Sequence, residues 1–122
     1  MTDKQARILI LDDDPAITEA LGIALPYYGY EVKALTSHAK LFSSVVKFSP
    51  DLIIMDYFLA GEEGTKMAEQ LREKAKLPKL KIIMISAHPS AKNDINPAYI
   101  DLFIAKPFDM GFLTKKIRQL TR

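Results

Sequence analysis

Cysteine is absent from this chain of 122 residues, and so is any long apolar run. Without cysteine the protein can form no disulfide and can bind no metal through thiolates, which agrees with a reducing compartment. No apolar stretch approaches the ~20 residues that a membrane-spanning helix needs. The first seven residues are polar and charged, so they lack the apolar segment of a secretion signal. We therefore expect a cytoplasmic protein that does not associate with membranes.

The chain also lacks internal repeats, low-complexity tracts and linkers. Its length is typical of one compact domain, and a domain of this size buries roughly two-thirds of the surface of its unfolded chain. We therefore expect a single domain over residues 1–122.

The net charge is small, because 17 Lys and Arg oppose 15 Asp and Glu. The basic residues gather at 66–81 and 115–122, with no interleaved aromatic residues and no base-reading motif. We interpret these runs as solvated helix faces and expect no direct binding to nucleic acid.

Short apolar runs alternate with longer amphipathic stretches along the sequence. This alternation is typical of βαβ units and a parallel sheet, and continuously apolar runs indicate strands covered on both faces. The sequence predicts an open α/β sandwich with strands near residues 7–11, 30–34, 52–56, 81–85 and 101–105.

Helices are predicted between these strands. Asp14 can cap a helix that begins at Pro15, and Pro26 should end or kink it because proline lacks an amide hydrogen. Further helices are predicted near 38–47 and 63–76, and after Asp109. Prolines and asparagines discourage a regular helix over 89–100, so a fourth helix there should be short or distorted.

Four of the five apolar runs end on reactive polar residues. In a parallel α/β sheet the carboxyl ends of the strands lie at one edge, where such folds bind their ligands. We therefore expect three carboxylates, a hydroxyl and an ammonium to converge there; they belong to Asp12, Asp13, Asp56, Ser86 and Lys106.

This set of residues suits a divalent cation and a phosphoryl group. Two carboxylates about 4 Å apart repel by about 4 kcal/mol at an effective dielectric near 20, so Asp12, Asp13 and Asp56 need a cation between them. Mg²⁺ accepts a few carboxylate oxygens and keeps several waters. The Lys106 ammonium and the Ser86 hydroxyl can contact phosphoryl oxygens, and a carboxylate such as Asp56 can act as the nucleophile.

The sequence resembles the receiver domains of two-component response regulators over residues 6–120. The resemblance rests on four segments in order: ILILDDDP at 8–15, PDLIIMD at 50–56 with Gly61 and Gly64 downstream, IIMISA at 82–87, and KPF at 106–108. It implies a flavodoxin-like (βα)5 three-layer sandwich whose five-stranded parallel sheet has the order 2-1-3-4-5.

The resemblance also implies a role for each residue. Asp56 would be the phosphoacceptor, and Mg²⁺ would be held by Asp13, by Asp12 through water, by Asp56 and by the Phe58 carbonyl. Ser86 and Lys106 would contact the phosphoryl group, Ser86 and Phe103 would form the switch, and the Lys106–Pro107 peptide would be cis.

The resemblance implies partners as well. A histidine kinase or phosphotransfer protein would supply the phosphate, and an output partner of unknown identity would read the switched surface. The protein would be a signalling module, not an enzyme with an external substrate, and either a monomer or a weak phosphorylation-dependent homodimer.

Four residues depart from the family pattern. Ala60 replaces a frequent proline, which predicts a less rigid loop after Asp56, and Asp14 replaces a frequent glutamate. Tyr99 and Ile100 replace a common Gly-Ala pair, so the fourth helix region should be atypical.

His88 lies close to the expected phosphoryl position and is a candidate for controlling water access, whereas His38 is expected to be solvated.

Two other interpretations stay open. Asp12-x-Asp14 matches the start of the haloacid dehalogenase signature, which would make the protein a small phosphohydrolase. However, Ala16 replaces the Thr or Val of that signature, and this length leaves no room for a cap domain. The other alternative is a phosphorylation-independent interaction module, which the complete set of polar residues argues against.

Overall fold

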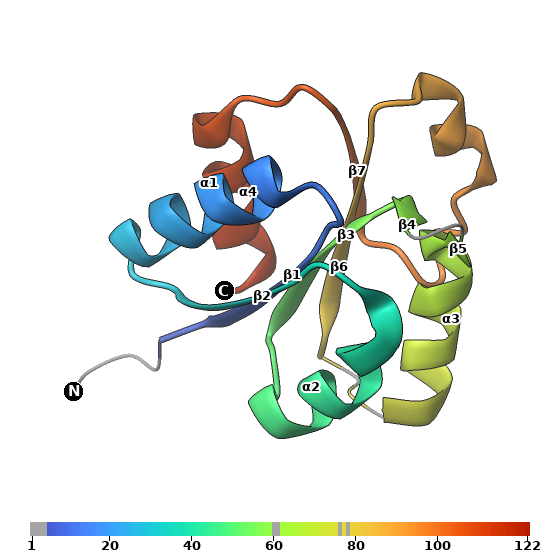
Figure 1. Cartoon of the computed structure of the whole chain (residues 1–122), viewed down its shortest axis with the longest axis horizontal. Helices are drawn as coiled ribbons and strands as arrows, with labels where there is room; N and C mark the ends of the chain where they lie inside the picture. The colour runs from blue at the N-terminus through green and yellow to red at the C-terminus, as the bar shows by residue number, and fades with distance from the viewer. Residues whose placement is uncertain (1–4, 60–61, 76, 78) are drawn as a thin grey trace.

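The fold is built around a parallel sheet of five strands (Figure 1). The computed structural model describes residues 5–59, 62–75, 77 and 79–122. Across the sheet the strand order is β2-β1-β3-β6-β7, which is 2-1-3-4-5 when these five strands are counted along the chain, as predicted. The strands are β1 Arg7–Leu11, β2 Glu31–Leu35, β3 Leu52–Asp56, β6 Lys81–Ser86 and β7 Leu102–Ala105.

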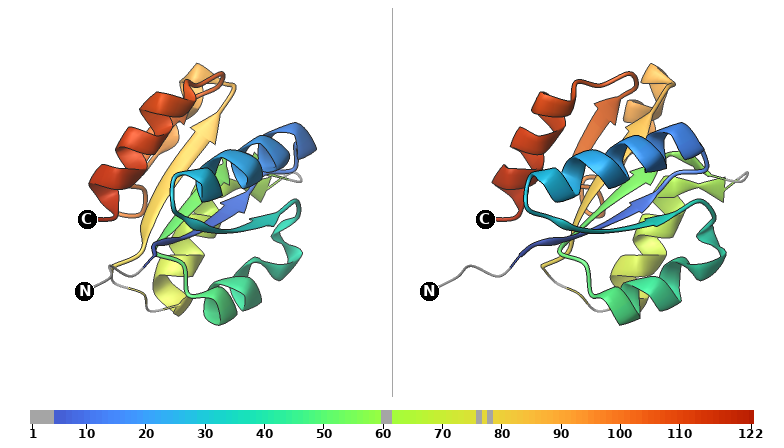
Figure 2. Two further views of the ribbon diagram at one scale, coloured as in Figure 1. Left: turned by 90° about the vertical axis from the view of Figure 1, so that its left-hand side faces the viewer. Right: turned by 60° about the vertical axis from the view of Figure 1, so that its left-hand side comes forward.

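Helices cover both faces of the sheet and complete the three predicted layers (Figures 1 and 2). One face carries α1 and α4, and the other carries α2 and α3. Their bounds are α1 Pro15–Tyr27, α2 Leu41–Phe48, α3 Gly64–Ala75 and α4 Met110–Leu120. None of the described helices has the length and apolar character required to cross a membrane.

Alternate residues of the central strands feed two separate apolar cores. In β1, Ile8 and Ile10 pack with residues of α1 and α4, whereas Leu9 and Leu11 pack with residues of α2 and α3. All four side chains are completely buried. Continuous apolar runs are therefore needed here because both faces of the strand are covered.

The helix ends follow the predicted caps. The Asp14 side chain accepts a hydrogen bond from the Ala16 amide at 3.0 Å, and the Asp109 side chain accepts one from Phe112 at 2.9 Å. α1 continues through Pro26 and ends at Tyr27, one residue later than the proline. The helix predicted near 38–47 is divided into the 3-10 segment η1, His38–Lys40, and α2.

Two short strands were not predicted. β4, Phe58–Leu59, pairs antiparallel with β5, Glu62–Glu63, between β3 and α3. Two residues are too few to show the alternation by which strands are recognised in a sequence. Ala60 and Gly61 lie outside the described residues, so the prediction for the loop at Ala60 stays a prediction.

The segment between β6 and β7 is atypical, as predicted. It contains only the 3-10 segment η2, Pro89–Asp94, in place of a regular fourth helix. The chain that follows is held by Arg72 of α3, whose guanidinium donates to the Tyr99 carbonyl at 3.2 Å and to the Leu80 carbonyl. Arg72 also pairs with Asp101 at 2.8 Å, and the same Asp101 oxygen accepts from the Ile82 amide at 2.7 Å.

We expect Arg72→Met to lower the free energy of unfolding by about 2 kcal/mol, because hydrogen bonds to a charged group are lost and part-buried carbonyls lose their donor. Urea unfolding followed by circular dichroism measures this change. Lys74→Met is the matched control, since it removes an exposed cation from the same helix. Equal free energies of unfolding for the two variants would contradict a stabilising role of the Arg72 hydrogen bonds, which we call the clamp at Arg72.

Candidate functional site

The predicted polar residues meet at one edge of the sheet. Asp12 follows β1, while Asp56 and Ser86 end β3 and β6. Lys106 follows β7, the neighbour of β6 in the sheet. The register aligns Leu11 with Met55, Asp56 with Ile85, and Ser86 with Ala105, so the last residues of neighbouring strands lie within one position of each other. Topology alone therefore brings residues separated by up to 94 positions into contact.

Lys106 links two of the carboxylates. Its Nζ lies 2.8 Å from Asp12 Oδ2 and 3.3 Å from Asp56 Oδ1. Its backbone amide donates to the Ser86 carbonyl at 2.8 Å, which fixes the start of its side chain against β6. The Lys106–Pro107 peptide is cis, as the resemblance implied.

Three carboxylates crowd this ammonium. Asp12, Asp13 and Asp56 each offer an oxygen, and these oxygens lie within 4.8 Å of one another. Asp12 is completely buried and Asp56 is 9% exposed, whereas Asp13 is exposed. Both carboxylate oxygens of Asp12 already accept hydrogen bonds: Oδ2 accepts from the Lys106 ammonium and Oδ1 accepts from the Asp14 amide at 2.9 Å.

The electrostatics follow from burial and charge. Burial raises the pKa of the Asp56 carboxyl; Lys106 opposes this, but Asp12 and Asp13 add to it, and the pKa lies above its ordinary value. Burial lowers the pKa of the Lys106 ammonium, but the hydrogen bond and charge of Asp12, together with Asp56, outweigh this and leave the pKa raised. One cation therefore serves two buried anions, and the cluster keeps excess negative charge.

This arrangement fits a hard divalent cation. Small oxygen ligands with exposed Asp13 at the outer edge suit Mg²⁺, which retains waters and takes few protein carboxylates. Exposed acidic groups often occur without a metal. Here, however, two of the three carboxylates are buried, and among the described residues a single ammonium pairs with them, which is unfavourable unless further positive charge binds.

Ser86 lies beside the carboxylates with its side chain almost fully buried. Its Oγ accepts a hydrogen bond from the His88 amide at 3.0 Å, and its own hydrogen can still be donated to a ligand. Phe103 is aligned with Met84 in the neighbouring strand and packs, partly buried, against the core on the α2–α3 side. Whether it occupies a second position stays a prediction.

Phe58 lies two residues after Asp56, in β4, with its side chain 48% exposed. Its ring contacts Tyr57 edge to face at 4.5 Å and His88 at 5.3 Å between centroids. His88 therefore lies near the site, as expected. The prediction of a solvated His38 differs from the structure, in which this residue is part-buried in the 3-10 segment η1, just before α2.

Two features of the site were missed by reasoning from the sequence. The buried Tyr57 donates its hydroxyl to Asp94 of η2 at 3.0 Å, and no sequence pattern marks that pair. Gly64 was recognised only as part of a motif. A Cβ at this position would lie 2.8 Å from the Asp56 carbonyl oxygen and 2.8 Å from Met84 Sδ, so the glycine lets α3 begin directly against the backbone of the phosphoacceptor candidate.

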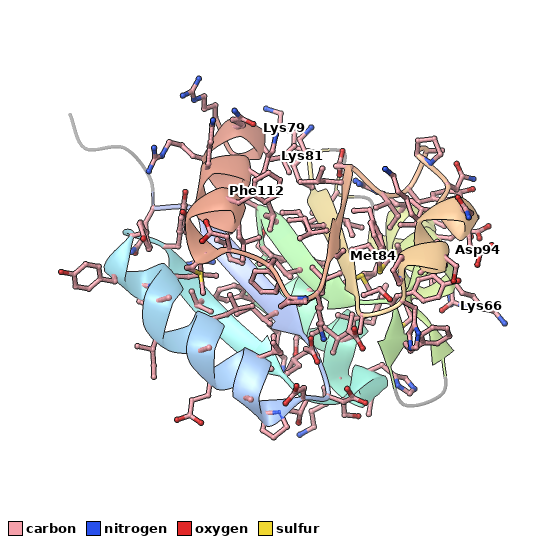
Figure 3. The ribbon with its side chains drawn as sticks, turned by 90° about the horizontal axis from the view of Figure 1, so that it is seen from above. Lys66, Lys79, Lys81, Met84, Asp94 and Phe112 are labelled. Atoms are coloured by element: carbon pink, nitrogen blue, oxygen red, sulfur yellow. The ribbon has the colours of Figure 1, made fainter. Side chains whose placement is uncertain are left out.

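Seen from above, the sheet separates the surroundings of the site into two sides (Figure 3). Phe112 marks α4 on one side, whereas Lys66 of α3 and Asp94 of η2 lie on the other. The carboxylates come from the carboxyl ends of β1 and β3, in the sheet between these layers.

The charge crowding makes a stability prediction. A carboxyl with a raised folded pKa stabilises the fold when protonated, and that contribution is lost as the pH rises through the folded pKa. We therefore expect Asp56→Asn to raise Tm at about pH 7 in metal-free buffer, and the gain to shrink as the pH falls and Asp56 becomes neutral in the parent protein.

Asp13→Ala is the companion variant, and we expect no loss of stability from it in the same buffer. Differential scanning calorimetry with EDTA measures both changes. A large fall in Tm for either variant at neutral pH would contradict the picture of crowded carboxylates.

Comparison with known proteins agrees with this geometry. The family model of the response regulator receiver domain matches residues 8–118. Among curated relatives, the DNA-binding dual master transcriptional regulator RpaA of Synechocystis is 31% identical over 118 residues, covering 95% of this chain and 49% of the relative. The phosphate regulon transcriptional regulatory protein PhoB of Pseudomonas aeruginosa is 31% identical over 117 residues, covering 94% and 51%. The chain spans about half the length of these relatives.

Solved structures share the fold along nearly their whole length. Response regulator protein TrrA of Thermotoga maritima, in complex with Mg²⁺-BeF, has a TM-score of 0.84 at 29% identity, covering 95% of this chain and 99% of that one. A CheY-like receiver domain protein of Methanospirillum hungatei has a TM-score of 0.83 at 28% identity, covering 95% and 93%. The family match contains Asp12, Asp56 and Lys106 together, and this chain therefore belongs to the response regulator receiver domain family.

Proposed function

We propose that Asp56 accepts a phosphoryl group from a phosphohistidine and that the resulting aspartyl phosphate switches an output surface. The observation that carries the proposal is the position of the Lys106 ammonium, 2.8 Å from Asp12 and 3.3 Å from Asp56. A fixed cation beside a buried nucleophile stabilises the negative charge of a phosphoryl group during transfer.

The transfer is an in-line displacement. An oxygen of the Asp56 carboxylate attacks the phosphorus, the phosphorus–nitrogen bond of the donor breaks, and the electron pair stays on the imidazole nitrogen. Lys106 and Ser86 contact the phosphoryl oxygens. Asp56 is 9% exposed at the sheet edge, which leaves it accessible to a donor while limiting access of water.

Asp13, Asp56 and the carbonyl of Phe58 would hold Mg²⁺. Asp12 would contribute through water, because both of its oxygens already accept hydrogen bonds from Lys106 and the Asp14 amide. When bound, the ion supplies positive charge that offsets the repulsion among the carboxylates and the phosphoryl oxygens.

The switch would involve Ser86 and Phe103. Phosphorylation adds charge next to Ser86 and Lys106, both attached to the ends of β6 and β7. Phe103 lies on β7 and is part-buried, so repacking of its ring would shift an equilibrium between two arrangements of this face.

The phosphate donor would be a histidine kinase or a phosphotransfer protein. A pocket of about 380 Å³ between α1 and the segment after β7 supports this partner, since it is lined by Lys106 and by apolar side chains that include Ile17, Phe108 and Met110. A donor helix seated there would present its histidine next to the site.

Residues 1–122 would act as one receiver domain, either alone or as part of a longer regulator such as the relatives of about twice this length. The output partner is unknown, and the monomer and the weak phosphorylation-dependent homodimer remain predictions. The same holds for the cytoplasmic location.

We expect acetyl phosphate and Mg²⁺ to add the mass of one phosphoryl group to the protein, and Asp56→Asn to abolish the addition. Intact-mass spectrometry measures both. Lys106→Met should still fold. It should be phosphorylated much more slowly, because the ammonium that faces the phosphoryl group is removed.

Asp14→Asn is the matched control, since it changes a carboxylate that caps α1 and should label normally. An unmodified parent protein would contradict the proposal. Turnover of a simple phosphate ester that survives Asp56→Asn would favour the phosphohydrolase interpretation instead.

A further inference from the structure

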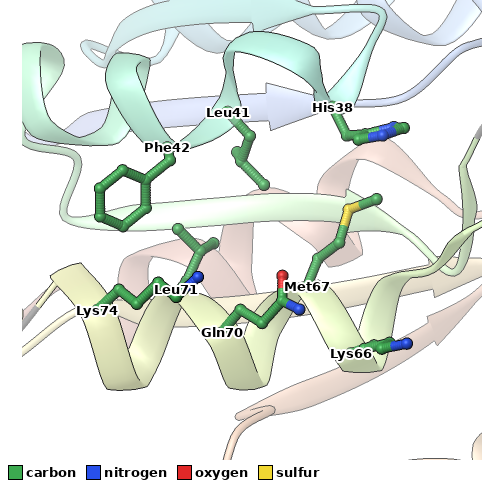
Figure 4. A pocket seen from close by; sticks show the side chains of 8 residues that line it. All are labelled: His38, Leu41, Phe42, Lys66, Met67, Gln70, Leu71 and Lys74. Atoms are coloured by element: carbon green, nitrogen blue, oxygen red, sulfur yellow. The ribbon is translucent and has the colours of Figure 1, made fainter.

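A second concave surface lies away from the carboxylates, between α2 and α3. This groove has a volume of about 480 Å³. Figure 4 shows Leu41 and Phe42 pointing from α2 toward α3, and Met67 and Leu71 pointing back from α3. The groove therefore has an apolar floor contributed by both helices.

The apolar surface extends beyond the floor. Phe42 is 44% exposed although it is aromatic, and Val46, one turn further along the same face of α2, is 62% exposed. The side of α2 that packs on the sheet is supplied instead by Leu41, Ser44 and Val45. Exposed apolar side chains gathered beside a groove mark a surface that binds another molecule.

The rim of the groove is positively charged. Lys66 and Lys74 line it from α3, eight residues apart, which corresponds to about 12 Å along a helix axis (Figure 4). Gln70 lies between them and offers a neutral amide. Among the described residues that line the groove there is no carboxylate, and Glu69 and Glu73 of the same helix are not part of its lining.

We propose that the groove between α2 and α3 binds a protein segment that carries apolar side chains flanked by carboxylates. The apolar side chains would cover the exposed ring of Phe42 and touch the small exposed parts of Leu41 and Met67, while carboxylates at the two ends would pair with Lys66 and Lys74. An amphipathic helix laid in an apolar groove is an established way for folded domains to recognise peptides.

The charge pattern selects an acidic peptide over a nucleic acid or an anionic membrane. A phosphate backbone is held by many basic contacts in succession, whereas two ammonium groups separated by an apolar floor offer few. The floor needs matching apolar side chains, which a peptide supplies. The proposal does not rest on phosphorylation of Asp56, because the groove is present in the unmodified protein.

The test uses the unphosphorylated protein and a fluorescein-labelled peptide of fourteen residues, with Leu and Phe in the middle and three Glu at each end. A matched peptide has Lys in place of every Glu. We expect the acidic peptide to bind with a Kd below about 1 mM in fluorescence anisotropy, and the basic peptide to bind at least tenfold more weakly. In ¹H–¹⁵N spectra the shifted amides should lie in α2 and α3.

Charge reversal in Lys66→Glu/Lys74→Glu should weaken binding of the acidic peptide at least tenfold. Phe42→Ala tests the floor and should weaken binding without unfolding the protein, because the ring is 44% exposed. The matched control is Lys115→Glu/Arg118→Glu, which makes the same change in net charge on exposed residues of α4, on the opposite face of the sheet. It should change the affinity less than twofold.

Several results would overturn the proposal. They are the absence of binding up to about 1 mM, equal binding of both peptides, shifted amides outside α2 and α3, and equal effects of the two charge reversals. Anionic vesicles or a DNA duplex that displace the peptide and lose affinity on Lys66→Glu/Lys74→Glu would assign the groove to those partners instead. We expect Asp56→Asn to bind the acidic peptide with the same affinity as the parent protein. This result would separate binding at the groove from the phosphorylation chemistry at Asp56.

Discussion

The contact on which the site depends is the one between a single ammonium and two buried carboxylates. Lys106 reaches Asp12 and Asp56, and a third carboxylate, Asp13, stands within 4.8 Å of both. One positive charge cannot balance three negative charges in a partly desolvated place, so the cluster remains electrostatically unsatisfied. That imbalance fits the binding of a divalent cation between the carboxylates. A phosphoryl group on Asp56, as proposed, would enter the field of the Lys106 ammonium, with Ser86 at the end of the neighbouring strand.

The apolar cores of the sheet offset the unfavourable free energy of these crowded carboxylates. The three interior strands β1, β3 and β6 are buried on both faces, and their side chains divide between two apolar cores. Hydrophobic burial of this extent outweighs an unfavourable polar cluster at the strand ends, provided that the cluster is confined to the edge. The parallel arrangement confines the cluster to one edge, since each contributing strand delivers only its last residue or the residues directly after it. Asp12, Asp56 and Ser86 therefore sit together although none is close to another in the sequence.

The sequence was sufficient where a feature repeats or where the residue type has one physical meaning. Runs covered on both faces predicted the strands, Asp14 and Asp109 predicted the helix starts, and prolines and asparagines over 89–100 predicted a short or distorted fourth helix. It was insufficient for contacts between side chains of separate elements. The pair of Tyr57 with Asp94, the clamp at Arg72 and the groove between α2 and α3 all depend on how finished elements pack. The β4–β5 pairing was missed because two-residue strands carry no periodicity.

Helix α3 contacts the site with its first residue and also lines the groove. α3 begins at Gly64, where any Cβ would press on the Asp56 carbonyl oxygen, and the Gly64 amide donates to the Tyr57 carbonyl. One turn further on, the same helix places Lys66 and Met67 at the groove. The backbone next to the phosphoacceptor candidate is thus in direct contact with the first turn of a helix that lines the second surface. Tight packing transmits displacement because interiors have little free volume. Linkage between the two places would be reciprocal: phosphorylation could change peptide affinity only by the factor by which the peptide changes the stability of the phosphorylated state.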